Sequence, residues 1–300
     1  MSKFAKLRAV TLVVLLMPSL FLTGPCFAET DLAEANVAPS DGPAPNPQEE
    51  QVRATYKVGV SAIDLGKFNV AMAVTPKTYT LTATGEFSVL GGLVYRAEGQ
   101  LNANGTHIGS ESKPQRFDFS YSDQRNEGSL QIGFGRGTVR SVTRKPKKRP
   151  DKKAVPIPED QLADVLDPLT AAFFSIHAEL PPGDLAICNQ TLRVFDGKRR
   201  FDLTLSPKRK VGLSVNAPMG LPAAAVCKVD YQPIGGHRAQ NETVNFLKNS
   251  GDIEVWLVPV PGTGITLPYK VVLPTAWGEG RIALVSLKAA PATVSHKEEN

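Results

Sequence analysis

The feature that most constrains the fold of this chain is a repeated alternation of apolar and polar residues in short runs. Side chains of a strand point alternately to its two faces, so each run predicts a strand with one buried face. Such runs begin at Val52 and cover 54–60, 66–74, 78–87, 94–101, 115–121 and 128–134. The pair Asn104-Gly105 after the fourth run is typical of a turn. Short strands at this spacing favour an antiparallel meander over βαβ units.

The second half of the chain shows the same pattern around a hairpin signal. Two alternating runs, 190–195 and 199–205, flank Asp196-Gly197. Because this dipeptide accepts positive φ angles, it predicts a hairpin with a type I′ turn. Further strands are predicted at 224–231, 253–258, 269–273 and 281–287.

One segment between these halves predicts a helix instead. Asp167 is a good N-cap, and Pro168 at the first helical position loses no hydrogen bond. An apolar face at helical spacing follows, made of Leu169, Ala172, Phe173 and Ile176. We therefore expect one principal α-helix over residues 168–179, stopped by the prolines and glycine at 181–183, with its apolar face packed on the concave side of the sheet.

The first 28 residues have the form of a secretory signal peptide. Lys3, Lys6 and Arg8 precede an apolar stretch, and Cys26-Phe27-Ala28 offers small residues at the cleavage positions. A membrane anchor is the alternative, but the apolar stretch is shorter than the roughly 18–20 residues that span a bilayer. Lipid attachment at Cys26 is a second alternative, disfavoured by Pro25. We predict cleavage between Ala28 and Glu29 and a periplasmic or secreted protein.

No later segment is long and apolar enough to predict a transmembrane helix. Removal of the signal peptide takes away three positive charges and lowers the net charge from +5 to +2. The mature chain is therefore close to neutral, and its charge says little about partners.

Three segments differ in composition from the patterned region at 52–288. Residues 29–51 have almost no large apolar side chain and predict a flexible linker, and residues 289–300 predict a disordered tail. Residues 140–158 form a basic, proline-rich run. A nucleic-acid or anionic-surface patch is one interpretation of this run. We favour a solvated loop, because the run lacks interleaved aromatic residues and an exported protein rarely meets nucleic acid.

Of the three cysteines, Cys26 leaves with the signal peptide, and Cys188 and Cys227 remain. Two cysteines in an oxidising compartment most simply form a disulfide. A redox-active pair is the alternative, but no C-x-x-C spacing supports it.

Catalytic and metal-binding patterns are absent from the sequence. The four histidines, His107, His177, His237 and His296, are isolated from one another and from the cysteines. No G-x-S-x-G nucleophile motif occurs, and the glycines at 133–137 have the wrong spacing for a phosphate-binding loop. The sequence therefore predicts no cofactor, no metal site and no catalytic residues.

Turn and core residues resemble an exported bacterial family known as domain of unknown function 3108. They are Tyr56, Gly66, Gly99, Gly105, Pro114, Phe117, Asp167-Pro168-Leu169, the run Phe195-Asp196-Gly197-Lys198-Arg199 with Phe201, Cys227, Gly235, Trp256, Pro268 and Gly278. By looser similarity, such proteins resemble the curved half-barrels that wrap a helix in lipoprotein carriers. The resemblance implies a curved antiparallel sheet or partly open barrel with an amphiphile-binding groove. Together with the strand pattern, the single helix and the cysteine pair, it gives a mainly β fold with one principal α-helix, cross-linked by a disulfide.

The candidate groove residues are Leu169, Phe173, Ile176, Trp256 and Trp277, although for the two tryptophans burial in the core is the favoured role. A binding or envelope-assembly factor for a lipid, lipoprotein or glycan is the favoured function. A structural partner of another envelope protein and a hydrolase acting on envelope polymers are the alternatives. An apolar pocket would favour the first, a flat apolar patch the second, and paired carboxylates in a cleft the third. The sequence does not indicate the oligomeric state.

Overall fold

Strands make up most of the residues that the structure, a computed structural model, describes: 52–89, 95–147, 149–173, 175–176, 180–275 and 277–289. The first half of the chain supplies β1 (Val52–Val60), β2 (Ile63–Val74), β3 (Thr78–Val89), β4 (Tyr95–Ile108), β5 (Glu111–Asp123), β6 (Glu127–Gly135) and β7 (Thr138–Lys145). The second half supplies β8 (Ser175–Ile176), β9 (Gln190–Phe195), β10 (Arg200–Gly212), β11 (Ala223–Gly235), β12 (Glu254–Pro259), β13 (Ile265–Thr275) and β14 (Gly278–Ala289). The helices are η3 (Glu159–Leu162), α1 (Pro168–Phe173), η4 (Leu185–Cys188), η5 (Pro218–Gly220) and α2 (Glu242–Asn249).

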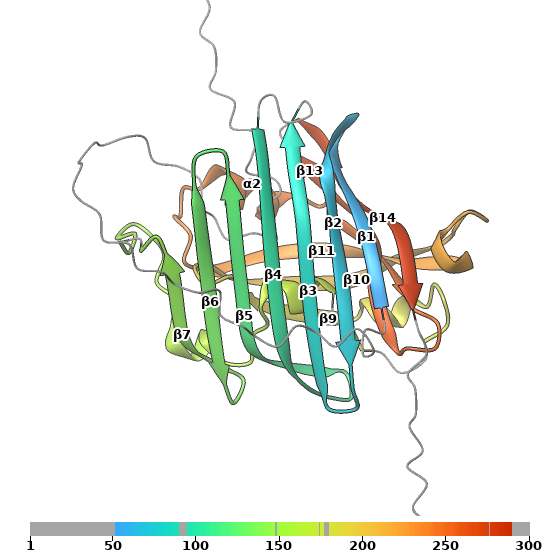
Figure 1. Ribbon diagram of the computed structural model, residues 1–300, viewed down its shortest axis with the longest axis horizontal. Coiled ribbons are helices and arrows are strands. Elements are labelled where there is room, and N and C mark those ends of the chain that lie inside the picture. The colour runs from blue at the N-terminus through green and yellow to red at the C-terminus, as the bar shows by residue number, and fades with distance from the viewer. Residues whose placement is uncertain are drawn as a thin grey trace, which may run out of the picture.

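All strands except β8 lie in one antiparallel path, which runs from β7 down to β1, crosses to β14, and continues down to β9. The first and last strands are therefore neighbours, and Val52 pairs with Ala289. The sheet folds over on itself: β2 to β6 stand upright in front, and β10 and β11 cross behind them (Figure 1). Two halves of one sheet thus face each other with strands at a steep angle.

A short segment joins the two edges of this sheet. No described ladder pairs β7 with β9, but residues 163–166, here called the strap, lie between them. The Asp164 amide donates to the Gly137 carbonyl (2.8 Å), the Leu166 amide donates to the Arg193 carbonyl (2.7 Å), and the Phe195 amide donates to the Leu166 carbonyl (2.9 Å). The predicted curved, partly open barrel is confirmed, with the strap along its open side.

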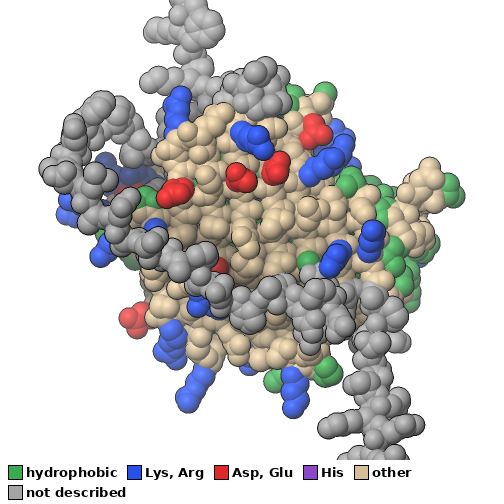
Figure 2. Space-filling view, viewed as in Figure 1, with side chains coloured by type: hydrophobic (Ala, Val, Ile, Leu, Met, Phe, Trp, Pro, Cys, Tyr) green, Lys and Arg blue, Asp and Glu red, His purple; other side chains and the backbone are tan. Residues whose placement is uncertain are grey.

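The alternation seen in the sequence becomes an inner and an outer face. In β1, every second residue from Val52 to Val60 is buried. The outer face of β2 to β6 presents mainly uncharged polar side chains with scattered charges (Figure 2). On the inner face, the Tyr56 ring stacks on Phe68 (5.0 Å between centroids), and both meet the edge of Phe173 from α1. The helix therefore packs on the concave face, as expected.

The predicted helix is shorter than its apolar spacing suggested. Asp167 caps α1 and Pro168 opens it, as predicted, but the helix ends at Phe173. Residues 175–176 form β8, where Ile176 pairs with Ile265 of β13. The prediction of a helix to residue 179 with Ile176 on its face was therefore wrong, because pairing with a strand replaces the helical turn.

A second helix, α2, was not predicted. It is short, and its signals are an Asn241 side chain that accepts a bond from the Val244 amide (2.9 Å) and two buried residues, Val244 and Leu247, at helical spacing. No described helix has the length and hydropathy needed to cross a bilayer.

Two turn predictions need correction. Gly105 lies inside β4 at a register shift opposite Pro114, where a Cβ atom would stand 2.4 Å from the Lys113 carbonyl oxygen. Glycine is needed there for close backbone approach rather than for a turn. The predicted hairpin of β9 and β10 is confirmed, but it is not a type I′ turn. Of the loop residues 196–199, only Gly197 has positive φ, and the Asp196 carboxylate accepts bonds from the amides of Lys198 and Arg199.

Several predicted segment limits also shift. The first residues of the basic run 140–158 belong to β7, and β14 extends through Ala289, the first residue of the predicted tail. The predicted signal peptide, its cleavage point between Ala28 and Glu29, and the linker 29–51 lie outside the described residues and stay predictions.

The predicted disulfide between Cys188 and Cys227 is confirmed, with Cα atoms 5.4 Å apart. It ties η4 to β11. Asp184 caps η4 by accepting a bond from the Ala186 amide (2.9 Å). Cys227 shares its face of β11 with Val229 and Tyr231 because side chains alternate along a strand, so the staple lies on the concave side of the second half.

Candidate ligand cavity

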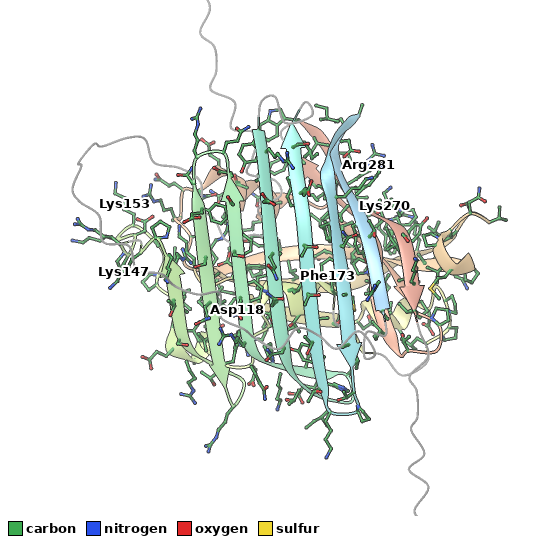
Figure 3. The ribbon with its side chains drawn as sticks, viewed as in Figure 1. Asp118, Lys147, Lys153, Phe173, Lys270 and Arg281 are labelled. Atoms are coloured by element: carbon green, nitrogen blue, oxygen red, sulfur yellow. A yellow bond between two sulfur atoms is a disulfide. The ribbon has the colours of Figure 1, made fainter. Side chains whose placement is uncertain are left out.

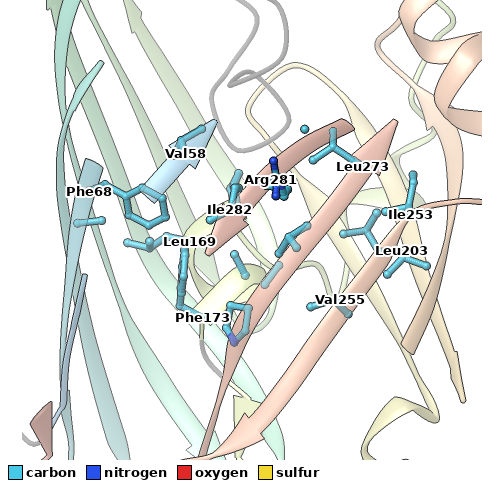
Figure 4. Close-up of a pocket in the computed structure, with 18 of the residues that line it drawn as sticks. Val58, Phe68, Leu169, Phe173, Leu203, Ile253, Val255, Leu273, Arg281 and Ile282 are labelled. Atoms are coloured by element: carbon cyan, nitrogen blue, oxygen red, sulfur yellow. The ribbon is translucent and has the colours of Figure 1, made fainter. Parts of the chain in front are cut away.

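A cavity of about 240 Å³ lies between the two halves of the sheet, with α1 along one side (Figure 4). Its walls come from β1 to β4, from α1 and from β9 to β14. Almost all of its lining residues are apolar: Val58, Leu65, Phe68, Ala83, Phe87, Leu101, Leu169, Ala172, Phe173, Leu192, Phe201, Leu203, Leu205, Val229, Ile253, Val255, Leu257, Val271, Leu273 and Ile282 are among them. Apolar cavities of about 150 Å³ already hold benzene, so this one has room for an apolar chain.

Strand alternation explains which residues face the cavity. Ile253, just before β12, and Val255 and Leu257 on β12 line it, so the residues between them point outward. Sequence reasoning missed these residues. The alternation marks two faces of each strand, but which face is concave is decided only when the halves meet.

Part of the cavity wall is incompletely packed. We use the name cavity wall for Leu192, Leu203, Val255 and Val271, which all point inward from the second half. Each is only half-buried, although the next inward-facing residue along its strand is buried: Val194, Leu205, Leu257 and Leu273, respectively. Inward-facing apolar side chains that keep accessible surface are what a ligand could cover, with a gain in free energy of about 25 cal/mol per Å².

Arg281 is the one charged residue that lines the cavity in the described part of the chain. Its guanidinium donates to the Ser61 carbonyl (2.7 Å) and lies 3.4 Å from Glu279. Figure 3 places Arg281 near the upper edge of the sheet, away from Phe173 in the middle. The lining residues Gly59 and Gly280 flank the same turns, so the charge marks one end of the cavity, here called the mouth.

A buried polar network holds α1 in place. Both Asp167 and Thr170 are fully buried, and the Thr170 hydroxyl donates to Asp167 Oδ2 (2.5 Å) and lies 3.2 Å from the Tyr79 hydroxyl. Asp167 Oδ1 accepts the amides of Leu169 and Thr170, each at 2.9 Å. Burial raises the pKa of Asp167 to about 6. The hydrogen bonds act in the opposite direction and lower the pKa, but burial has the larger effect. The network positions the cavity-lining face of the helix.

The structure brings only two of the five predicted groove residues to the cavity, Leu169 and Phe173. Ile176 lies in β8, and its side chain is outside the described part. Trp277 is 51% exposed in the turn before β14. It is therefore neither core nor groove.

Trp256 is half-buried on the outer face of β12. It lies between the cations of Arg209 and Lys270, 5.6 and 5.0 Å from its ring centroid, and donates to Glu254 (3.1 Å). Hydrogen bonds from Arg209 and Lys208 lower the pKa of Glu254 to about 2. Trp256 points outward because Val255 and Leu257 take the inner face.

Within the described residues, no three His, Cys, Asp or Glu side chains gather in a way that could hold a metal ion. His107 lies in β4 and His237 follows β11, and the structure of His177 and His296 is outside the described part.

The chain matches none of the curated proteins. It is similar to a crystal structure of a "Beta-barrel-like Protein of Domain of Unknown Function DUF1849" from Brucella abortus, with 11% identity and a TM-score of 0.45 over 80% of this chain and 98% of that one. The model of a family described as "Protein of unknown function (DUF3108)" matches residues 51–285, from just before β1 to within β14. This chain therefore belongs to the DUF3108 family.

Proposed function

We propose that this protein is a binding protein of the cell envelope that holds one apolar chain of an amphiphile, such as a lipid or the lipid part of a lipoprotein. The single observation that carries the proposal is the apolar cavity between the sheet halves and α1. Ligand sites are typically concave and mostly apolar, with few polar groups that fix orientation. Arg281 at the mouth is suited to the polar end of such a ligand.

The proposed place of action, outside the cytoplasm, rests on the predicted signal peptide and on the disulfide, which persists in oxidising compartments. The proposed role is binding rather than catalysis. Supporting it, the cavity lining of the described chain includes no carboxylate, histidine or cysteine. The buried carboxyl nearest in sequence to the lining, Asp167, is already used as a helix cap.

The test is titration of the mature protein with a fluorescent fatty acid, with native mass spectrometry of any lipid that copurifies. Leu203→Phe should fill the cavity and weaken binding at least about tenfold, which corresponds to about 1.4 kcal/mol. Thr204→Phe is the matched control, because Thr204 is exposed on the opposite face of the same strand. Equal affinities for wild type and both variants would contradict binding in the cavity.

A further inference from the structure

Two large apolar side chains are exposed on neighbouring turns beside the mouth. Ile63 is 54% exposed at the start of β2, and Trp277 is 51% exposed between β13 and β14. The turns are joined by the Ser61 amide, which donates to the Glu279 carbonyl (2.8 Å), and the Ser61 hydroxyl, which donates to the Trp277 carbonyl (3.0 Å). We call these two turns the rim.

The rim and the mouth belong to one end of the barrel. Arg281, which lines the cavity, donates to the Ser61 carbonyl in the rim. Val60 pairs with Ile63 across one turn and with Gly280, another lining residue, across the neighbouring ladder. An apolar ligand that enters at the mouth would therefore pass beside Ile63 and Trp277 as it moves from its source into the cavity.

We propose that the rim docks on a lipid bilayer surface, with Trp277 and Ile63 inserted into the interfacial region. This inference rests on the proposed function, because it supplies the route by which an amphiphile reaches the cavity. The indole ring of tryptophan, apolar with one polar N–H, favours the membrane–water interface. A hairpin turn that is cross-linked to its neighbour holds both side chains in place at low entropic cost.

The charges near the rim indicate what kind of attraction drives docking. Lys57 lies 3.7 Å from Asp64, and Arg281 lies 3.4 Å from Glu279, so each of these cations has a carboxylate beside it. Local charge compensation leaves little net attraction for anionic lipid. Docking should therefore depend on apolar insertion, occur on phosphatidylcholine vesicles, and change little with salt.

The first experiment uses the fluorescence of the two tryptophans. In Trp256→Phe, only Trp277 emits, and we expect its emission to shift to the blue on addition of phosphatidylcholine vesicles and to be quenched by brominated phosphatidylcholine. In Trp277→Phe, the remaining Trp256 on the outer face of β12 should respond to neither. An unchanged Trp277 emission would overturn the proposal, and so would binding that requires phosphatidylglycerol and disappears in salt.

The second experiment measures vesicle cosedimentation of rim variants. Ile63→Ser and Trp277→Ser should each lower partitioning about tenfold, a loss of the order expected for one large apolar side chain. Ile108→Ser is the matched control: Ile108 is 75% exposed on the β4–β5 turn, and the strand register puts that turn at the opposite end from the rim. An equal loss in all three variants would contradict docking at the rim.

Binding of a soluble fluorescent fatty acid, measured without vesicles, separates the two proposals. Trp277→Ser should keep wild-type affinity in that assay, since Trp277 does not line the cavity. Vesicle docking without fatty-acid binding in the wild type would refute the proposed function and leave the docking surface standing. Fatty-acid binding without vesicle docking would refute the docking surface alone.

Discussion

The two sides of the barrel interior are packed differently, although both are built from alternating strands of one sheet. On the first-half side, Tyr56, Leu81, Phe117, Leu130 and Ile132 are all less than 2% exposed; we call them the packed cluster. On the second-half side, the cavity wall is half-buried, and Cys188–Cys227 staples the same face. None of the packed cluster lines the cavity, whereas all of the cavity wall does. Stability and ligand space are therefore assigned to different parts of the interior, because close packing and an open cavity cannot occupy the same volume.

α1 lies where these two sides meet, and Phe173 takes part in both. Its ring contacts Tyr56 and Phe68 at 5.3 and 5.8 Å between centroids, and it also lines the cavity. If the comparison holds, perturbing the packed cluster should mainly change stability. Perturbing the cavity wall should mainly change binding.

The largest effect is expected from Phe173→Ala. Because the ring is 4% exposed and packed among aromatic residues, its loss should lower the free energy of unfolding by about 4 kcal/mol. Denaturant unfolding beside wild type measures this value. A cost below about 1 kcal/mol would mean that the ring belongs to the loosely packed side.

Removal of the disulfide should have the next largest effect. The bridge closes a loop with a sequence separation of 39 residues, so the double variant Cys188→Ser/Cys227→Ser should lose about 3 kcal/mol. If the staple compensates for loose packing on the cavity side, the variant should also bind fatty acid more weakly. Unchanged fatty-acid binding at temperatures where the variant stays folded would show that the disulfide does not maintain the cavity. Thiol labelling of native wild type should find neither sulfur free.

Leucines on the two sides give a direct test. Leu81→Ala in the packed cluster should cost about 3 kcal/mol, and Leu203→Ala in the cavity wall should cost about 1 kcal/mol, because less buried area is lost. Equal costs in denaturant unfolding would show that both sides are packed alike.

The smallest effect concerns the network under α1. Burial raises the pKa of Asp167 from 3.8 to about 6, so the folded state favours the protonated carboxyl. The stability this contributes is present in full below pH 3.8 and is lost as the pH rises through 6. Lowering the pH from about 7 to about 5 should therefore raise the free energy of unfolding by about 1 kcal/mol more in wild type than in Asp167→Asn.

Asparagine is the suitable replacement because its side-chain oxygen can still cap the helix. The neighbouring Tyr79 stays neutral over this range, since burial raises its pKa further above the usual value. Identical pH profiles for the two proteins would show that Asp167 is not the titrating group.

Features that depend only on residues close together in the sequence could be predicted from the sequence alone. Asp167 and Pro168 open a helix wherever the chain lies, and alternating runs form strands with two distinct faces. The pairing of Cys188 with Cys227 followed from their number and predicted compartment. These predictions needed no knowledge of which strands become neighbours.

Features that depend on residues far apart in the sequence could not be predicted from the sequence alone. The spacing from Leu169 to Ile176 fits a helix, but a strand partner at Ile265 ends it. Trp256 was expected in the core or in the groove because it is large and aromatic, but the register of β12 turns it outward between Arg209 and Lys270. The cavity wall was missed because the concave face exists only once the halves are stacked.

The pairing of β1 with β14 also determines the order in which the barrel can form. Val52 and Ala289 are at opposite ends of the described chain and neighbours in the sheet. Until β14 is available, β1 has an unpaired edge and the two halves lack their central join. Pairing across so large a sequence separation is slow and follows local hairpins. The barrel therefore cannot be completed before β14 is available, and until then β1 presents an unpaired edge of the kind that favours aggregation.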